Sequence, residues 1–234
     1  MTTIHELPWN DDYTWKEFRK STQDIKKIFN FSSNLHVTLE NIDSFTYRHW
    51  TVAYCIRHVK KFTNIKNANF VECGVADGIT AFFALRELFA DKNDGIPNFY
   101  LFDAWESMDK SSLTELESTR ATTYSRLSFE RTKSNLNEYI DFLVFHKGHL
   151  PESLDSVPKV PDSIIYLHVD INSSIVTQEI LEFFYPKLEK GGIILFDDYG
   201  WTTFIETKKI VDIFFSNKPG MLLPLPTGQA IYFK

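Results

Sequence analysis

Cysteine is scarce in this sequence: Cys55 and Cys73 are the only two among 234 residues. Two cysteines cannot build the disulfide framework on which small secreted proteins depend. The chain opens with MTTIHELPWNDD, which is acidic and has no apolar core, so we expect no signal peptide. No stretch approaches the roughly 20 apolar residues that cross a bilayer. Together these absences predict a cytoplasmic protein without membrane contact.

A block of Lys and Arg is also missing. The 25 basic residues are outnumbered by 31 acidic ones, which gives a formal net charge of -6. Nucleic-acid-binding domains carry a basic stripe, so we expect no nucleic-acid partner. Hydrophobic residues are plentiful at 43%, including 21 Phe, and supply the core of one large domain.

Two parts of the chain follow different patterns. Residues 1–65 carry helical signals only, as in SFTYRHWTVAYCIRHVKKF. Over residues 66–234, helical stretches alternate with short apolar runs: NFVECG, NFYLFD, DFLVFH, IIYLHVD and GIILFDD. MLLPLP and AIYFK suggest a closing hairpin. The pattern predicts an α/β, Rossmann-like fold, with a seven-stranded, mostly parallel sheet and helices on both faces.

Local signals mark two helix ends and one long loop. Lys187 and Lys190 before Gly191-Gly192 predict the end of a helix, and Thr203 with Glu206 has the spacing of a capping box at the next helix start. Residues 106–123 are polar and interrupt the alternation. Such a loop is either a lid or binding loop, or a poorly ordered surface excursion.

The passage NFVECGVADGIT runs from an apolar strand through a glycine turn into a helix. In the dinucleotide fingerprint G-x-G-x-x-G, the second glycine lets the backbone approach a pyrophosphate. Here Ala76 stands in that place, between Gly74 and Gly78. Glu72 and Asp77 flank the turn, and their carboxylates would repel a diphosphate. The turn is therefore unsuited to a dinucleotide.

A cationic ligand fits the same turn. S-adenosylmethionine (SAM) carries a sulfonium and an ammonium and has no phosphate, and a small-residue turn lets its amino-acid part lie close to the backbone. Glu72 could bind the ammonium, directly or through water. Asp103 ends the next strand, where ribose hydroxyls are commonly bound in doubly wound folds. The alternative for Asp103 is a plain surface or capping residue.

Several longer passages resemble one known family. VECGVADGIT, FDAWES, FHKGHLPESL, YLHVDINSSIVTQEILEFFYPKLEKGGIILFDDYGW and PLPTGQAIYFK look like the macrocin O-methyltransferase (TylF-type) group of class I SAM-dependent methyltransferases. The resemblance implies SAM as methyl donor, a hydroxyl acceptor on a sugar or glycosylated small molecule, and a divalent metal, usually Mg²⁺. It also implies a homo-oligomer, in which residues 1–65 pack subunits together or cover the site as a lid. Residues 66–234 would form the methyltransferase domain.

We expect SAM to be held at the glycine turn and the ends of the next two strands, by Glu72, Gly74, Ala76, Gly78, Asp103, Trp105 and Gly148. Three further acids end two other strands: Asp170 closes IIYLHVD, and Asp197 and Asp198 close GIILFDD. If these strands are neighbours, as the family order implies, their ends lie about 5 Å apart. Three carboxylates there would repel one another unless a hard cation neutralised them, and such ligands suit Mg²⁺ or Ca²⁺.

On this interpretation the metal orients and polarises the acceptor hydroxyl, and we assign catalytic roles to Asp170 and Asp198. One acid of the adjacent pair could instead cap the following segment. The family pattern after the first metal acid usually continues with Asp, a hydrophobic residue and Tyr, where this sequence has Asn172, Ser173 and Ser174. Asn172 keeps a carbonyl ligand but removes a charge. The loop histidine of some relatives has no counterpart between residues 106 and 124.

The general base and the acceptor stay open at this stage. We expect His168 in the core, and His146 and His149 packed near the adenine. Tyr199 and Trp201 either form a stacking wall for a sugar ring or fill structural positions. The alternative functions are methyl transfer to an amine or carboxylate, a non-catalytic binding module, and a nicotinamide-dependent oxidoreductase.

Overall fold

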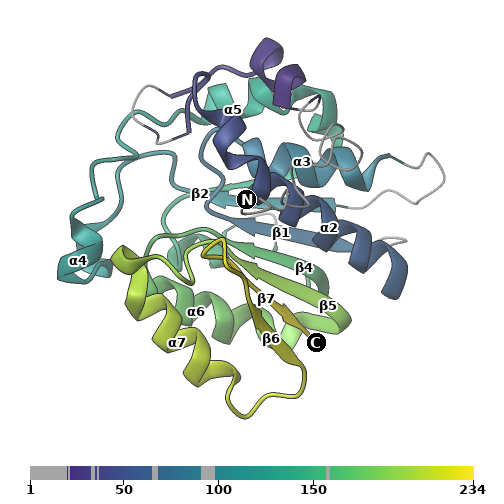
Figure 1. Cartoon of the computed structure of the whole chain (residues 1–234), viewed down its shortest axis with the longest axis vertical. Coiled ribbons are helices and arrows are strands. Elements are labelled where there is room, and N and C mark those ends of the chain that lie inside the picture. Colours follow the sequence, from purple (N-terminus) through teal and green to yellow (C-terminus); the bar gives the residue numbers. More distant parts are fainter. Residues whose placement is uncertain are drawn as a thin grey trace, which may run out of the picture.

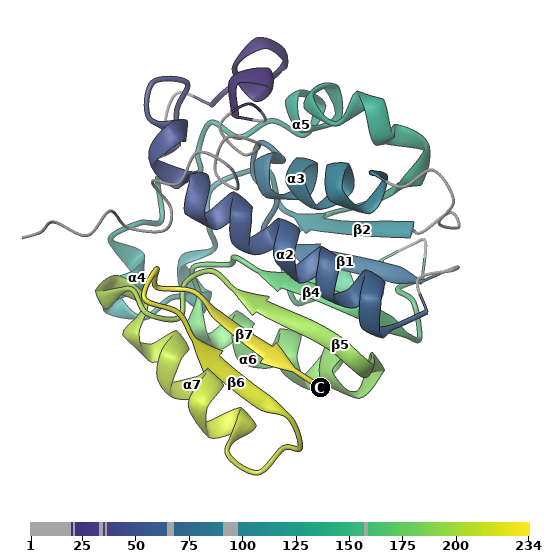
Figure 2. The same ribbon diagram turned by 45° about the vertical axis from the view of Figure 1, so that its right-hand side comes forward.

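The computed structural model describes residues 20, 22–32, 35, 37–64, 68–90, 98–156 and 159–234. A seven-stranded sheet with the order β3-β2-β1-β4-β5-β7-β6 forms its centre (Figures 1 and 2). The strands are β1 (Asn69–Cys73), β2 (Asn98–Asp103), β3 (Leu143–Lys147), β4 (Ile164–Val169), β5 (Leu188–Phe196), β6 (Met221–Pro224) and β7 (Ala230–Phe233). The first five are parallel, and β7 runs antiparallel to β5 and β6. The predicted fold and its closing hairpin are confirmed.

Helices cover both faces of this sheet (Figure 1). One face carries α2 (Thr46–Phe62), α3 (Ile79–Leu88) and α5 (Phe129–Asn135), and the other carries α6 (Ser174–Phe184) and α7 (Ile205–Phe215). Neighbouring strand residues serve opposite cores, as the two-residue period of a strand requires: Phe70 packs on the α3 side and Val71 on the α6 side. Among the helices that the structure describes, none is long and apolar enough to span a membrane.

Helix α2 lies on the sheet although it comes from the N-terminal segment. Its residues Val52, Ile56 and Val59 recur at helical spacing and are fully buried, and the helix contacts α3 and β5. His49 stacks on Phe83 of α3, with ring centroids 4.3 Å apart. The helix is therefore fixed against the core. The role of residues 1–65 in covering the site or packing subunits stays a prediction, and residues 1–19 lie outside the described part.

The predicted end of the helix before Gly191 is wrong. Helix α6 ends at Phe184, a 3-10 turn with Pro186 follows, and β5 begins at Leu188. Proline lacks the N–H that a continuing helix needs, so it outweighs the lysine and glycine signals farther on. Gly191 consequently lies inside a strand.

The predicted capping box at Thr203 and Glu206 is also absent from the described structure. Phe204 is the N-cap of α7 and makes no side-chain cap hydrogen bond. A capping box forms instead between Thr114 and Glu117, at the start of the short helix α4 (Glu115–Ser118) in the long loop.

Candidate functional site

The turn between β1 and α3 presses against the end of β4. Gly74 has a φ of +87°, and a Cβ built on it would lie 1.9 Å from the carbonyl oxygen of Asp170. No side chain fits there, so glycine lets the turn reach the strand end that carries Asp170. Ala76 adopts a φ of +48°, in the left-handed region that costs a residue with a Cβ roughly 1–2 kcal/mol. Gly78, with a φ of +89°, is the N-cap of α3.

Asp103, at the end of β2, holds this turn with its carboxylate. Its Oδ2 accepts hydrogen bonds from the backbone N–H groups of Val75 and Ala76, each at 2.8 Å, and Oδ1 accepts one from Trp105 at 2.6 Å. Burial raises the pKa of Asp103, against the opposing effect of these donors. A carboxylate has about four acceptor positions, so these three bonds leave one position, and the predicted contact with a ribose hydroxyl stays a prediction.

Two of the predicted SAM contacts lie beneath the turn. Glu72 is fully buried and accepts a hydrogen bond from Thr80 at 2.6 Å. Trp105 is buried, and its indole N–H donates to the carbonyl of Ala76 and to Thr132. Both residues support the turn, and their roles as cofactor ligands stay predictions. Four other predicted SAM residues line a pocket: Gly74, Ala76, Asp103 and Gly148.

Asp77, in the same turn, binds the N-terminal segment. Its carboxylate accepts hydrogen bonds from the backbone N–H of Ser32 at 2.6 Å and from the Ser32 hydroxyl at 2.7 Å. Asn135 donates to the backbone carbonyl of Asp77 at 2.9 Å. Just beyond Ser32, Leu35 and Val37 line the pocket. Asp77 therefore fixes a segment that closes one side of the site, a role that its sequence position does not reveal.

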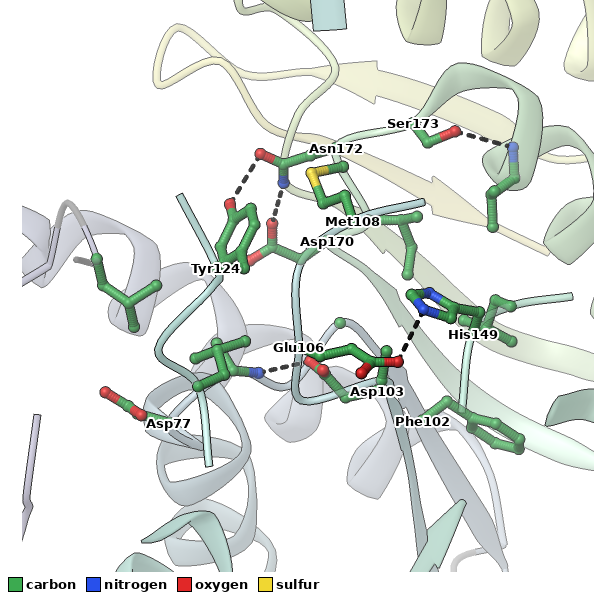
Figure 3. A pocket seen from close by; sticks show the side chains of 18 of the residues that line it. Asp77, Phe102, Asp103, Glu106, Met108, Tyr124, His149, Asp170, Asn172 and Ser173 are labelled. Atoms are coloured by element: carbon green, nitrogen blue, oxygen red, sulfur yellow. Dashed lines mark hydrogen bonds and ion pairs between the residues drawn. The ribbon is translucent and has the colours of Figure 1, made fainter. Parts of the chain in front are cut away.

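The pocket lies at the carboxyl ends of the central strands and joins two chemically different ends (Figure 3). One end contains the glycine turn, Asp103 and the apolar walls Phe102 and Leu150. The other end is polar and is formed by Arg48, Tyr124, Asp170 and Asn172. Apolar walls with a few convergent polar groups are typical of a site for a small molecule.

Arg48, in the first turn of α2, joins two of the strand-end acids. Its Nη2 lies 2.7 Å from Oδ2 of Asp170 and 2.5 Å from Oδ2 of Asp197, and its Nε donates to Oδ1 of Asp197 at 3.0 Å. The Arg48 side chain is only 9% exposed. Burial opposes the charge, but Asp197, Asp170 and Asp198 outweigh burial and raise the pKa of Arg48. The guanidinium therefore stays charged inside the site.

The sequence around Arg48 carries only a weak signal for this role. The residue stands 122 positions before Asp170 in the chain, on a helix whose spacing predicts only packing. This signal is an arginine on the apolar side of a helix, next to His49. A charge in such a place needs a buried partner, but the sequence does not indicate which one.

Asp198 points to a different partner from its neighbour Asp197. Its Oδ2 accepts hydrogen bonds from the backbone N–H and the side-chain amide of Asn172, at 3.0 and 2.9 Å. The same amide donates to Asp170 at 3.3 Å, and Asn172 Oδ1 accepts from the Tyr124 hydroxyl at 2.9 Å (Figure 3). Burial and then Asp197 raise the pKa of Asp170 to about 6, and burial and Asp170 raise that of Asp198. The three carboxylates of Asp170, Asp197 and Asp198 outnumber the single positive charge of Arg48, so they repel one another.

The predicted magnesium site does not fit an ion in this arrangement. Within the part of the chain that is described, His168, Asp170 and Asp197 offer ligand atoms within 4.8 Å of one another. However, Arg48 Nη2 already binds one oxygen of each acid. Mg²⁺ requires oxygens at about 2.0–2.1 Å, so an ion among these oxygens would lie against the guanidinium. Ligation by Asp170, Asp197 and Asp198 stays a prediction that requires Arg48 to move.

The long loop after β2 folds over the pocket. Glu117 is buried and accepts a hydrogen bond from the backbone N–H of Ser174 at 2.9 Å, while the Ser173 hydroxyl donates to the carbonyl of Ser112 at 2.5 Å. These bonds tie the loop to the start of α6. Met108 and Tyr124 of the loop line the pocket. The contacts favour a binding loop over a poorly ordered excursion.

The three strand-associated histidines differ in their surroundings. His146 is buried and stacks on Phe102 at 4.3 Å, and His168 is buried with Nδ1 3.6 Å from Glu72, so both occupy packing positions. His149 lines the pocket and pairs with Glu106 at 3.0 Å (Figure 3). His149 is therefore the histidine of this group that a bound ligand would meet.

Tyr199 and Trp201 are not among the residues that line the described pocket. The Tyr199 hydroxyl donates to Asp212 on α7 and accepts from Lys208 at 3.0 Å. Trp201 is 47% exposed and packs against Gly228. These contacts favour the structural interpretation over a stacking wall for a sugar.

His49 makes the fold sensitive to acid. The side chain is buried, and its Nδ1 has no hydrogen-bond partner among the described residues. Burial and the charge of Arg48 lower the pKa of His49 to about 3. An unfolded histidine has a pKa of about 6.5. The unfolded chain therefore binds the proton first, and stability is lost as the pH falls from 6.5 towards 3.

We expect His49→Phe to remove this part of the acid sensitivity. Below pH 6.5, the free energy of unfolding of the wild type should fall relative to the variant by up to about 1.4 kcal/mol per pH unit. Urea unfolding of both proteins between pH 7.5 and 5 measures this difference. His58→Phe, on the same helix but less buried, is the control. Parallel curves for wild type and His49→Phe would contradict a neutral, buried His49.

Residues 71–199 match a protein family described as "Methyltransferase domain". The chain belongs to this family. It therefore contains a SAM-dependent methyltransferase domain, and the match covers more than half of its 234 residues. The matched range runs from β1 through the glycine turn to the acids after β5. A nicotinamide-dependent oxidoreductase is set aside by this finding.

Solved structures of methyltransferases share the fold. The O-methyltransferase NovP is 18% identical with a TM-score of 0.68, covering 81% of this chain and 80% of NovP. The calicheamicin methyltransferase CalS11 is 17% identical with a TM-score of 0.63, covering 98% of this chain and 94% of CalS11. An apo structure of CalS11, described as a TDP-rhamnose 3'-O-methyltransferase, is 15% identical with a TM-score of 0.56, over 98% and 96% of the two chains. A search among curated proteins finds no match.

Proposed function

We propose that this methyltransferase transfers the methyl group of SAM to a hydroxyl of a sugar or a glycosylated small molecule. The observation that carries the proposal is the close approach of Gly74 to the backbone carbonyl of Asp170, which brings the proposed SAM turn next to a partly buried carboxylate within one pocket. The resemblance to TylF-type enzymes and the sugar named in the description of CalS11 support a carbohydrate acceptor.

SAM would bind with its adenosine part against Phe102, Asp103 and Gly148 and its amino-acid part along the turn at Gly74 and Ala76. All five residues line the pocket, and the two glycines have no side chain that would occupy it. The methyl-bearing sulfonium would then face the acidic end, where carboxylates favour a positive charge.

Methyl transfer is an in-line displacement, so the acceptor oxygen must lie opposite the sulfonium sulfur at near-attack distance. The oxygen lone pair forms the new C–O bond while the C–S bond breaks and its electron pair goes to sulfur. Asp170 accepts the hydroxyl proton in this scheme, since its carboxylate lines the pocket and its pKa of about 6 leaves it ionised at neutral pH. Asp198 acts through Asn172, which orients Asp170 and Tyr124. No step uses Mg²⁺.

Residues of the N-terminal segment support its proposed role as a cover for the site. Leu35, Val37 and Arg48 line the pocket, and Ser32 is anchored on Asp77. We further expect a homo-oligomer, as the family resemblance implies. Sedimentation of the full chain would measure its oligomeric state directly.

Binding of the donor is the first test. We expect SAM or S-adenosylhomocysteine to raise the melting temperature, and Asp103→Ala to abolish that rise because the variant loses both the turn's anchor and the ribose partner. Asp162→Ala removes an acid that is 80% exposed and serves as the control. Absence of any shift with either ligand in the wild type would refute the proposed donor site.

The acceptor is found by offering labelled SAM with nucleotide sugars, glycosides and polysaccharide fragments to the full chain. Matched amine and carboxylate compounds belong in the same screen. Label appearing only in an amine or carboxylate product would overturn the hydroxyl acceptor while leaving the methyltransferase assignment intact.

A further inference from the structure

Two of the strand-end acids converge on one point, and a guanidinium nitrogen occupies it. Asp170 Oδ2 and Asp197 Oδ2 lie 2.7 and 2.5 Å from Arg48 Nη2. Asp197 is bound again by Arg48 Nε at 3.0 Å and by Gln229 at 2.8 Å. The protein therefore supplies its own cation where the sequence predicts a metal.

Arg48 is held in this place by the fold. Arg48 belongs to the first turn of α2, and the buried side chains of this helix pack on the sheet. The residue after Arg48, His49, stacks on Phe83 of α3. The two acids lie just beyond the ends of adjacent strands β4 and β5. Since α2 and both strands belong to the packed core, the fold itself places Arg48 beside the two acids.

The side-chain amide of the neighbouring Asn172 directs its nitrogen, and not its oxygen, towards the acids. Its amide nitrogen faces Asp198 and Asp170, and its oxygen accepts from Tyr124. A metal ion would need that oxygen directed towards the acids. Asn172 also carries no charge. Less positive charge is therefore needed to neutralise the site than if an acid stood at this position.

We propose that Arg48 replaces the divalent metal in this enzyme. The guanidinium neutralises Asp170 and Asp197, and, because Arg48 lines the pocket, its charge stabilises the negative charge that develops on the acceptor oxygen. Methyl transfer then proceeds without Mg²⁺, with the bond changes given above. This inference rests on the proposed function for its catalytic part, whereas the absence of metal binding is testable alone.

The test measures Mn²⁺ binding by electron paramagnetic resonance, with Mn²⁺ as a probe for a magnesium site. We compare chelator-treated wild type, Arg48→Met, which removes the charge, and Arg57→Met, which removes an arginine of the same helix that pairs with Glu87. We expect wild type and Arg57→Met to bind Mn²⁺ only weakly, and Arg48→Met to bind it roughly tenfold or more tightly. Arg48→Lys keeps a charge and should behave like the wild type. If Arg48→Met does not fold, the wild-type measurements with Mn²⁺ and a chelator still decide the inference.

Stoichiometric Mn²⁺ binding by the wild type that Asp170→Asn removes would overturn the inference, as would loss of transfer in a chelator that added Mg²⁺ restores. Unchanged transfer in the chelator supports it. The same samples are heated with S-adenosylhomocysteine. A ligand shift together with tight Mn²⁺ binding in the wild type sinks this inference alone, whereas the lack of a ligand shift sinks the proposed function, whatever the metal result.

Discussion

Replacing Asp170 with asparagine is expected to lower the rate of methyl transfer by about 10²- to 10⁴-fold, the usual contribution of a positioned general base. Of the acids that follow β4 and β5, Asp170 is the one in the described pocket lining, and its backbone carbonyl lies against Gly74 of the proposed SAM turn. Single-turnover transfer of labelled methyl to the best acceptor of the screen measures the loss.

The Asp170→Asn variant should keep its fold and its donor site. Asparagine has nearly the same shape, and Arg48 retains Asp197 as a partner. Burial and the charge of Asp197 raise the pKa of Asp170, so loss of the Asp170 charge is not expected to destabilise the folded state at neutral pH. We therefore expect little change in melting temperature and an intact shift with S-adenosylhomocysteine. Asp162→Asn is the surface control, and a wild-type transfer rate in Asp170→Asn would remove the proposed base.

Gly74→Ala is expected to abolish SAM binding. The new Cβ would meet the carbonyl oxygen of Asp170 at 1.9 Å, at a backbone φ of +87° that disfavours any side chain. The turn must then retreat from β4, which both widens the donor site and separates it from Asp170. Calorimetric titration with S-adenosylhomocysteine measures the loss, and thermal unfolding should show a drop in stability of a few kcal/mol.

Ala76→Gly is the matched control in the same turn. It removes the strain of an alanine at φ +48° but adds backbone freedom to the unfolded chain, so the two effects oppose each other. We expect its melting temperature and ligand titration to stay near those of the wild type. Equal titrations for Gly74→Ala and the wild type would show that the turn does not contact the donor.

The sheet and the glycine turn were predictable because their signals are local. Apolar runs such as IIYLHVD mark buried parallel strands, and Gly74 and Gly78 lie where the backbone turns left-handed. Helix ends were less predictable, since Pro186 stops α6 ahead of the lysine and glycine signals.

The direction of each side chain could not be predicted from its position in the chain. Glu72 and Trp105 belong to the passages predicted to form the donor site, yet both side chains lie beneath the turn, because strand alternation and the fold of the turn decide the direction. Asp197 and Asp198 separate for a similar reason, one towards Arg48 and one towards Asn172. Arg48 enters the site through the packing of α2 on the sheet, a tertiary contact that has only a weak local signal.

A crystal structure of the full chain with S-adenosylhomocysteine and Mg²⁺ tests the central claim most directly. The account predicts the ribose at Asp103, the sulfur turned towards Asp170, and the Arg48 guanidinium still between Asp170 and Asp197. A ligand bound elsewhere, or a magnesium ion between the two acids with Arg48 displaced, would contradict it.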